Sequence, residues 1–154
     1  MKKINTSRFK KTLSKFSTGV TVVAINHRNK LIGKTINSFA AFSLNPPIVL
    51  FSLDKKSSSL ELYKKTKYIS INILSNKQVE ISKHFARKNP DWGKVPFKLS
   101  LLEVPNINKC IGNLECKKIK FYSYGDHILF LCEVLNSNYN DNLKPLLYFN
   151  SKYL

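Results

Sequence analysis

The stretch KTINSFAAFSLNPPIVLFSLDKKSSS, residues 34–59, decides how the rest of the chain is arranged. Its middle, residues 48–53, is almost entirely apolar, which predicts a strand buried on both faces. Pro46 and Pro47 fit the entrance of this strand, because proline cannot donate a ladder hydrogen bond. On either side of the strand stand small hydroxyl and amide side chains, accompanied by aromatic rings or lysines. Such groups can hold a polar, planar, phosphorylated molecule.

Hydrophobic periodicity predicts short strands separated by turns, together with a few short helices. A first helix, capped by Thr6 or Ser7, is expected to lie with its apolar face against a sheet. Residues 87–108 contain three prolines and Trp92, and they are expected to form a loop or lid. Strands are expected at residues 20–25, 30–40, 48–53, 68–74, 110–119, 127–135 and 146–149, and further helices at residues 57–65 and 79–86.

The number and spacing of these elements indicate the fold class. Six or seven short strands at hairpin spacing, with only two or three short helices, predict a mainly β fold, a small antiparallel β-barrel with peripheral helices. The helices do not alternate with the strands, which argues against a doubly wound parallel sheet. A length of 154 residues with 43% hydrophobic residues suits one core, so residues 1–154 are expected to form a single domain.

The chain is strongly basic, with 26 Lys and Arg against 9 Asp and Glu, a formal charge of +17. No acidic residue precedes Asp54. Such a charge raises the question of a nucleic-acid or anionic membrane partner. The excess is mostly lysine and is spread over the whole chain, which favours a solvated basic face over a dedicated nucleic-acid site. The same field would still attract phosphorylated small molecules.

The cysteines and the apolar segments indicate the compartment. Cys110, Cys116 and Cys132 are odd in number and form no CxxC pair, so neither a disulfide framework nor a zinc site is expected. Each is expected to be a small core residue in a reducing compartment. The sequence shows no signal-peptide pattern and no run near the roughly 20 apolar residues of a membrane span. We therefore expect a soluble, cytoplasmic protein without a membrane partner.

Two groups of polar residues are candidate binding elements. Ser57 and Ser58 follow two lysines and are expected to open a helix, where free N–H groups, hydroxyls and the helix dipole favour a phosphate. A plain serine cap beside solvated lysines accounts for the same residues. Asn37 and Ser38 stand at the end of an expected strand and could bind the edge of a heterocycle. A strand-end turn explains them equally well.

Other candidate chemistry is sparse. The common nucleotide-binding, metalloprotease and hydrolase motifs are absent, the carboxylates are scattered, and no metal site is predicted. His127 begins an apolar strand after a Gly-Asp turn, so its ring points either into a site or onto the barrel rim. The tyrosines near the C-terminus, including Tyr153, could stack on an aromatic ligand or close the core.

The ordered motifs together resemble one family. FSTGVTVVAI at residues 16–25, TINSF, SLNPPIVL and DKKSS within residues 34–59, and the later HFA, LEC, GDH and PLLY segments are similar to those of the short-chain flavin reductase family. The match covers nearly the whole chain. The resemblance implies an FMN-binding split β-barrel, a homodimer, and reduction of FMN, with FAD or riboflavin as further substrates, by NADH or NADPH. It also implies a monooxygenase partner that receives the reduced flavin.

The resemblance also implies roles for particular residues, and two positions depart from the family pattern. Lys34 stands where the family usually has an apolar Met, and Ser151 replaces a common Gly before the terminal Tyr. By analogy, Thr35, Asn37, Ser38 and Phe39 would line the isoalloxazine and ribityl chain, Ser52 and Leu53 would present backbone groups, Ser57 and Ser58 would meet the phosphate, Phe85 and Ala86 would flank the flavin, and His127 and Tyr153 would border the nicotinamide or the ring.

Two other functions remain open at this level. One is a flavoprotein that holds FMN but does not reduce free flavin, and the other is a basic nucleic-acid-binding barrel with steeply salt-dependent binding. The choice between NADH and NADPH is also open, because this fold type lacks the Rossmann residue that reads the 2′-phosphate.

Overall fold

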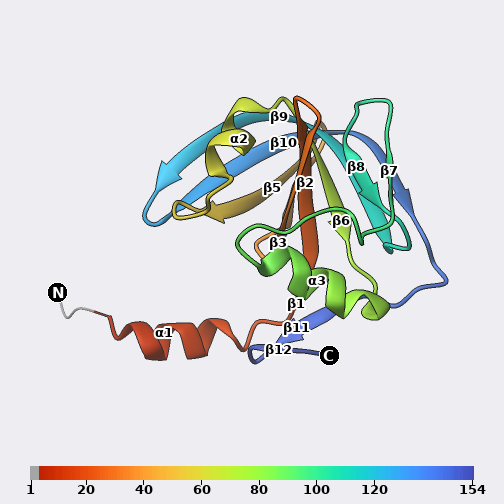
Figure 1. The fold of residues 1–154 in the computed structure, drawn as a ribbon. Helices are drawn as coiled ribbons and strands as arrows, with labels where there is room; N and C mark the ends of the chain where they lie inside the picture. Colours follow the sequence, from red (N-terminus) through yellow and green to blue (C-terminus); the bar gives the residue numbers. More distant parts are fainter. Residues whose placement is uncertain (1–3) are drawn as a thin grey trace.

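A computed structural model describes residues 4–154, which form a mainly β fold with three short α-helices (Figure 1). Seven strands make one antiparallel sheet in the spatial order β3-β2-β6-β9-β10-β5-β4. This confirms the predicted mainly β, antiparallel class. The strands of the sheet are β2 (Thr21–His27), β3 (Lys30–Ile36), β4 (Ala40–Leu44), β5 (Pro47–Asp54), β6 (Tyr68–Ile73), β9 (Gly112–Tyr124) and β10 (His127–Tyr139).

Shorter elements surround this sheet. α3 packs on β2 and β3, and the C-terminal strands lie beneath it with β1 (Figure 1). The remaining strands are β1 (Thr18–Gly19), β11 (Leu147–Phe149) and β12 (Lys152–Tyr153) in a three-stranded sheet, and β7 (Phe97–Leu99) and β8 (Pro105–Ile107) in a two-stranded one. The helices are α1 (Thr6–Leu13), α2 (Leu60–Lys65), the 3₁₀ helix η1 (Asn76–Gln78) and α3 (Val79–Ala86).

The connection between β3 and β4 forces the sheet to curl. These two strands are the opposite edges of the sheet, yet only residues 37–39 join them. Six strand spacings in a flat sheet would separate the edges by about 29 Å, whereas the four steps from Ile36 to Ala40 span at most about 14 Å. The sheet must therefore bend until its edges meet. The described strands form no closed barrel, because no ladder pairs β3 with β4.

The curled sheet encloses the main core. Phe51 of β5 and Phe130 of β10 stack inside it, with ring centroids 5.0 Å apart and planes inclined by 11°. Tyr63 of α2 is fully buried against Phe130, and its hydroxyl donates to the Val23 carbonyl oxygen at 2.8 Å. A second core lies beneath α3, around Phe85. Because β2 separates the two cores, its residues 21–25 are all buried.

A buried amide cluster anchors the segment that was predicted to be a loop or lid. Asn72 of β6 accepts from the Ile107 backbone N–H at 2.8 Å, and its own amide donates to the Val22 carbonyl oxygen at 3.1 Å. Ser70 donates to the Pro105 carbonyl oxygen at 2.6 Å, and Asn113 donates to Asn72 at 2.7 Å. These bonds fix β7 and β8 over the sheet, so the second half of the predicted loop contains two short strands joined by a turn.

Several local predictions differ from the structure. α1 carries no buried residue and projects away from the sheet, and Asn5 caps it through a 2.9 Å bond from the Arg8 N–H (Figure 1). The expected strand at residues 30–40 breaks after Ile36 at the sheet edge. β5 buries only alternate residues, because one of its faces lines the concave core and the other is partly open. The expected helix at residues 57–65 begins only at Leu60.

The cysteines are core residues, as the sequence predicts. All three cysteines are buried and free. Burial raises the pKa of Cys110 and of Cys132 to about 12, so both remain neutral thiols at neutral pH. Within residues 4–154, every helix is too short or too polar to cross a bilayer.

Gly33 permits the close contact between β3 and α3. A Cβ atom at this position would lie 2.6 Å from Cε1 and 2.7 Å from Cδ1 of the Phe85 ring, and 3.0 Å from Cζ2 of Trp92. Both rings are packed, with centroids 4.7 Å apart. We expect Gly33→Ala to lower the free energy of unfolding by about 1–3 kcal/mol, because the rings or the backbone must move. Urea denaturation of the purified protein measures this change.

The matched control for this prediction is Gly19→Ala. A Cβ atom at Gly19 would meet no heavy atom within 4 Å, so its effect should stay within about 0.5 kcal/mol. Equal unfolding free energies for Gly33→Ala and Gly19→Ala would show that the Phe85 contact is not tight.

Candidate functional site

A hollow of about 360 Å³ opens at the seam where the two edges of the sheet approach each other. We call it the central hollow. It collects residues from the end of β3, the β3–β4 connection, the end of β5 and the start of β10. Seven of the predicted site residues line it, namely Thr35, Asn37, Ser38, Ser52, Leu53, Ser57 and His127. Lys34, Ile36, Asp54 and Lys56 complete its lining.

A reciprocal pair of hydrogen bonds closes the floor of the central hollow. Ser38 Oγ donates to the Ser52 carbonyl oxygen at 2.9 Å and accepts from the Ser52 N–H at 3.1 Å. The Ser38 hydroxyl thus replaces a ladder partner for β5 just before the start of β4. Both backbone groups of Ser52 are occupied by this contact, so Ser52 acts as a support for the β3–β4 connection.

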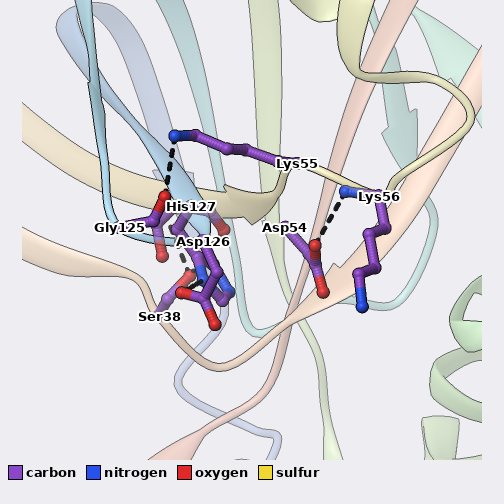
Figure 2. A network of polar contacts seen from close by, with 8 residues as sticks. Ser38, Asp54, Lys55, Lys56, Gly125, Asp126 and His127 are labelled. Atoms are coloured by element: carbon purple, nitrogen blue, oxygen red, sulfur yellow. Dashed lines mark hydrogen bonds and ion pairs between the residues drawn. The ribbon is translucent and has the colours of Figure 1, made fainter.

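A polar network holds the rim beside β10 (Figure 2). Strand pairing sets His127 opposite Asp54, and the Lys55 ammonium donates to the Gly125 carbonyl oxygen at 2.7 Å. The Lys55 N–H also donates to the Asp126 carbonyl oxygen at 2.9 Å. Lys56 N–H donates to the Asp54 carboxylate at 2.7 Å. The turn after β5 and the turn before β10 are therefore tied together.

His127 and Asp126 form a hydrogen bond at this rim. His127 Nδ1 lies 2.7 Å from Asp126 Oδ1, and because an ionised carboxylate only accepts, the imidazole is the donor. The hydrogen bond from His127 lowers the pKa of the Asp126 carboxyl, with the charges of His127 and Lys55 acting in the same direction. This contact fixes the orientation of the His127 ring at the edge of the central hollow.

A second hollow, of about 300 Å³, adjoins the central one and is called here the tyrosine hollow. Thr35 and Asn37 line both hollows, while Tyr148 and Tyr153 line only the second. Tyr153 reaches it because a two-residue turn folds β12 back on β11, with Asn150 and Ser151 at φ values of 50° and 62°. Ser151 thus adopts the left-handed conformation that glycine accommodates more easily.

One buried serine joins the walls of the tyrosine hollow. The Ser82 carbonyl oxygen of α3 accepts from the Thr35 hydroxyl at 2.6 Å, and Ser82 Oγ lies 2.9 Å from the Tyr153 hydroxyl. Sequence reasoning did not single out Ser82. Its only local signal is a small polar residue among the apolar positions of a helix, which is also common without any role in a site.

A third hollow, of about 320 Å³, lies on the other side of Lys34 and is called here the lysine hollow. It is lined by Lys30, Leu31, Ile32, Gly33, Lys34, Ser58, Ser59, Leu62, Lys88, Asn89 and Pro90. Ser58 therefore faces a different hollow from Ser57. The turn at residues 57–59 precedes α2, and Ser57 and Ser59 bring their hydroxyl oxygens within 3.2 Å of each other. Ser59 is the N-cap residue of α2, but its side chain makes no capping hydrogen bond. The groups that this region offers to a ligand are therefore mainly hydroxyls and lysines.

Three predicted site residues lie outside these hollows. Phe85 is fully buried in the second core, against Gly33 and Trp92. Phe39 is half-buried and packs on the main core. Ala86 is exposed at the end of α3, where its carbonyl oxygen lies 3.5 Å from the Lys34 ammonium. Within residues 4–154, no group of three His, Cys, Asp or Glu side chains is arranged to hold a metal ion.

Comparison with known proteins identifies the family of this fold and site. The sequence model of the flavin reductase like domain matches residues 13–154. The chain belongs to the flavin reductase-like family. The alignments with individual members of the family cover most of this chain, as the shared motifs do.

Relatives of known name support this assignment to the flavin reductase-like family. The chain is 34% identical to the FMN reductase (NADH) SmoA of Agrobacterium fabrum, over 89% of this chain and 79% of the relative. It is 31% identical to the flavin-dependent monooxygenase reductase subunit HsaB of Mycobacterium tuberculosis, over 97% of this chain and 82% of the relative.

Solved structures of the family share the fold. The flavin reductase PheA2 in its native state superposes with a TM-score of 0.90 at 33% identity, covering 98% of this chain and 97% of that one. The NADH:FAD oxidoreductase SgcE6 of Streptomyces globisporus gives a TM-score of 0.92 at 25% identity, covering 100% and 96%.

The Asp126–His127 pair generates a pH prediction. Because the folded-state pKa of the Asp126 carboxyl is lowered, its contribution to stability is present at neutral pH and is lost as the pH falls through that lowered pKa. In His127→Ala the donor is gone, so the pKa of Asp126 should rise toward the ordinary value of 3.8. Carboxyl carbon chemical shifts, followed by NMR during an acid titration of both proteins, measure this change. An unaltered pKa in the variant would show that the pair does not form in solution.

Proposed function

We propose that this chain is an NAD(P)H-dependent flavin reductase that acts on FMN, free or as the flavin half of FAD. One observation carries the proposal. The seam of the sheet gathers hydroxyls, an amide and lysines around the central hollow, in a chain of the flavin reductase-like family. The relatives named above as FMN reductase (NADH) and as a monooxygenase reductase subunit support the same activity.

The residues of the central hollow fit the chemistry of FMN. Asn37 and Thr35 offer amide and hydroxyl groups for the edge of a planar heterocycle, while Ile36 and Leu53 offer apolar surface. Ser57 and Lys56 stand at the far end, where a hydroxyl and an ammonium suit a phosphate. We infer that Ser38 and Phe39 complete the ring and ribityl site, that Ser58 assists Ser57, and that Phe85 and Ala86 support the flavin from behind β3.

The chain's own residues act by positioning. Bound flavin would supply the hydride chemistry, since it accepts a hydride from the nicotinamide. The Ser38–Ser52 contact holds the β3–β4 connection at a fixed place beside β5. The Asp126 carboxylate orients the His127 ring at the rim, and Ser82 orients Tyr153. We infer that His127 and Tyr153 border the nicotinamide, and that alignment, more than acid or base catalysis, provides the rate enhancement.

The assembly and its setting follow as further parts of this proposal. We infer a homodimer, supported by the exposed apolar side chains of Phe42 and Leu44 on edge strand β4, which are 62% and 92% accessible. We infer that residues 1–154 act as one domain and that reduced flavin passes to a monooxygenase. The buried, free cysteines support a reducing, cytoplasmic setting. Either NADH or NADPH serves as the donor.

The direct test is NADH and NADPH oxidation by purified protein in the presence of FMN, followed by the loss of reduced nicotinamide absorbance. We expect oxidation well above the rate with flavin alone. Failure with both nicotinamides would overturn the reductase proposal. Tightly retained yellow cofactor with negligible turnover would favour the flavoprotein that holds FMN without reducing free flavin.

The phosphate end of the site has its own prediction. Ser57→Ala should raise the dissociation constant of FMN by about tenfold, because a hydrogen bond to a charged group is lost. Riboflavin, which lacks the phosphate, should bind both proteins equally. Ser137→Ala, an exposed position on β10 outside the hollows, is the control. Isothermal titration calorimetry gives the constants, and equal losses for FMN and riboflavin would argue against a phosphate contact at Ser57.

A further inference from the structure

The lysine hollow is a concentration of positive charge that no carboxylate balances. Lys30 and Lys34 are four residues apart on one face of β3, and Lys88 comes from the segment after α3. None of the residues that line this hollow is acidic. The ion pairs formed within residues 4–154 involve other lysines or His127. Three cations gathered without a counter-charge repel one another, so an anion bound between them is favoured.

In the lysine hollow, Lys34 and Ser58 make only weak polar contacts. The Lys34 ammonium lies 3.5 Å from the Ala86 carbonyl oxygen and 3.4 Å from that of Arg87. The Ser58 hydroxyl lies 3.4 Å from the Lys88 carbonyl oxygen. These distances exceed those of good hydrogen bonds, so a phosphate can take over the same donors at little cost.

Apolar groups complete the lining of the lysine hollow. Leu31, Ile32, Leu62 and Pro90 supply surface beside the three lysines and the two serines. A hollow of about 320 Å³ with apolar walls and a few charged groups matches a nucleotide better than a bare inorganic ion. The apolar walls can cover a purine while the lysines bind its phosphate.

The lysine hollow continues directly from the central hollow. Lys34 lines both, and the neighbouring residues Ser57 and Ser58 line one each. A ligand whose first phosphate lies at Ser57 therefore has its next group at Ser58 and Lys34. FMN ends at that first phosphate, whereas FAD continues through a second phosphate to adenosine.

We propose that the lysine hollow binds the adenylate half of FAD, so that this chain binds FAD more tightly than FMN. This inference rests on the proposed flavin site. It gives Lys34, which departs from the apolar residue of the family pattern, a role in choosing the dinucleotide. Lys30 and Lys88 contact the second phosphate or the adenosine and leave the FMN half unaffected.

The test compares the dissociation constants of FAD and FMN by isothermal titration calorimetry. In Lys30→Ala/Lys88→Ala, the constant for FAD should rise at least tenfold and that for FMN less than threefold. The control is Lys77→Ala/Lys98→Ala, which removes the same charge from exposed positions outside the lysine hollow and should leave both constants within twofold. Circular dichroism melting checks that both variants fold.

Three outcomes would overturn the inference. Equal losses for FAD and FMN would place the FMN phosphate itself in the lysine hollow. Unchanged constants for both would show that the hollow binds neither flavin. A selective rise in the KM for NADPH over NADH, with FAD binding intact, would assign the lysines to the 2′-phosphate. The binding measurement does not depend on turnover, so it separates the two proposals. If the protein oxidises no nicotinamide but the double variant shows the expected weaker binding of FAD, the reductase proposal is overturned and the FAD-binding proposal stands.

Discussion

The three-residue connection between β3 and β4 is the constraint on which the rest of the structure depends. It joins opposite edges of a seven-stranded sheet, so it can be satisfied only by curling the sheet until those edges approach each other. The curl creates the inner core around Phe51 and Phe130, and it leaves one seam without a ladder. Ser38 bridges that seam through the backbone of Ser52. The binding groups gather there because unpaired strand ends leave room for a ligand.

Electrostatics gives the seam its chemical character. The central and lysine hollows are lined by lysines of β3, of the turn after β5 and of the segment after α3. The carboxylates at the rim already have partners, because Asp54 accepts from the Lys56 N–H and Asp126 accepts from His127. A phosphorylated ligand therefore meets free cations inside a site whose polar rim is already fixed. The excess positive charge of the chain adds a long-range attraction for such ligands, an effect that weakens as ionic strength rises.

Local patterns predicted some elements well and others poorly, for physical reasons. The alternation of residues 68–74 predicted β6, although the structure buries Ser70 and Asn72 on its polar face as well. α3 follows from its apolar periodicity, since it buries Phe85 on one face. The start of α2 was predicted three residues too early, because the serines at residues 57–59 form a turn in which two hydroxyls bind each other. α1 was expected on the sheet from its apolar face, yet among residues 4–154 none of its side chains is buried. Phe85 matches the family motif, but it packs beneath Gly33 and lines none of the hollows.

The chemistry of the site was already present in the residue types along the chain, as hydroxyls and an amide beside an apolar strand, a serine turn after two lysines, and a histidine after a Gly-Asp turn. The mainly β class likewise follows from local alternation and turn residues. Tertiary structure alone decided which of these groups share a hollow. Ser57 and Ser58 line different hollows although they are neighbours in the sequence. Lys88 and Lys30 line the same hollow although more than fifty residues separate them. Ser82 contacts both Thr35 and Tyr153 and so links the C-terminus to the end of β3. Such neighbours depend on sheet curvature and strand register, which arise from the whole fold and leave no local periodic signal.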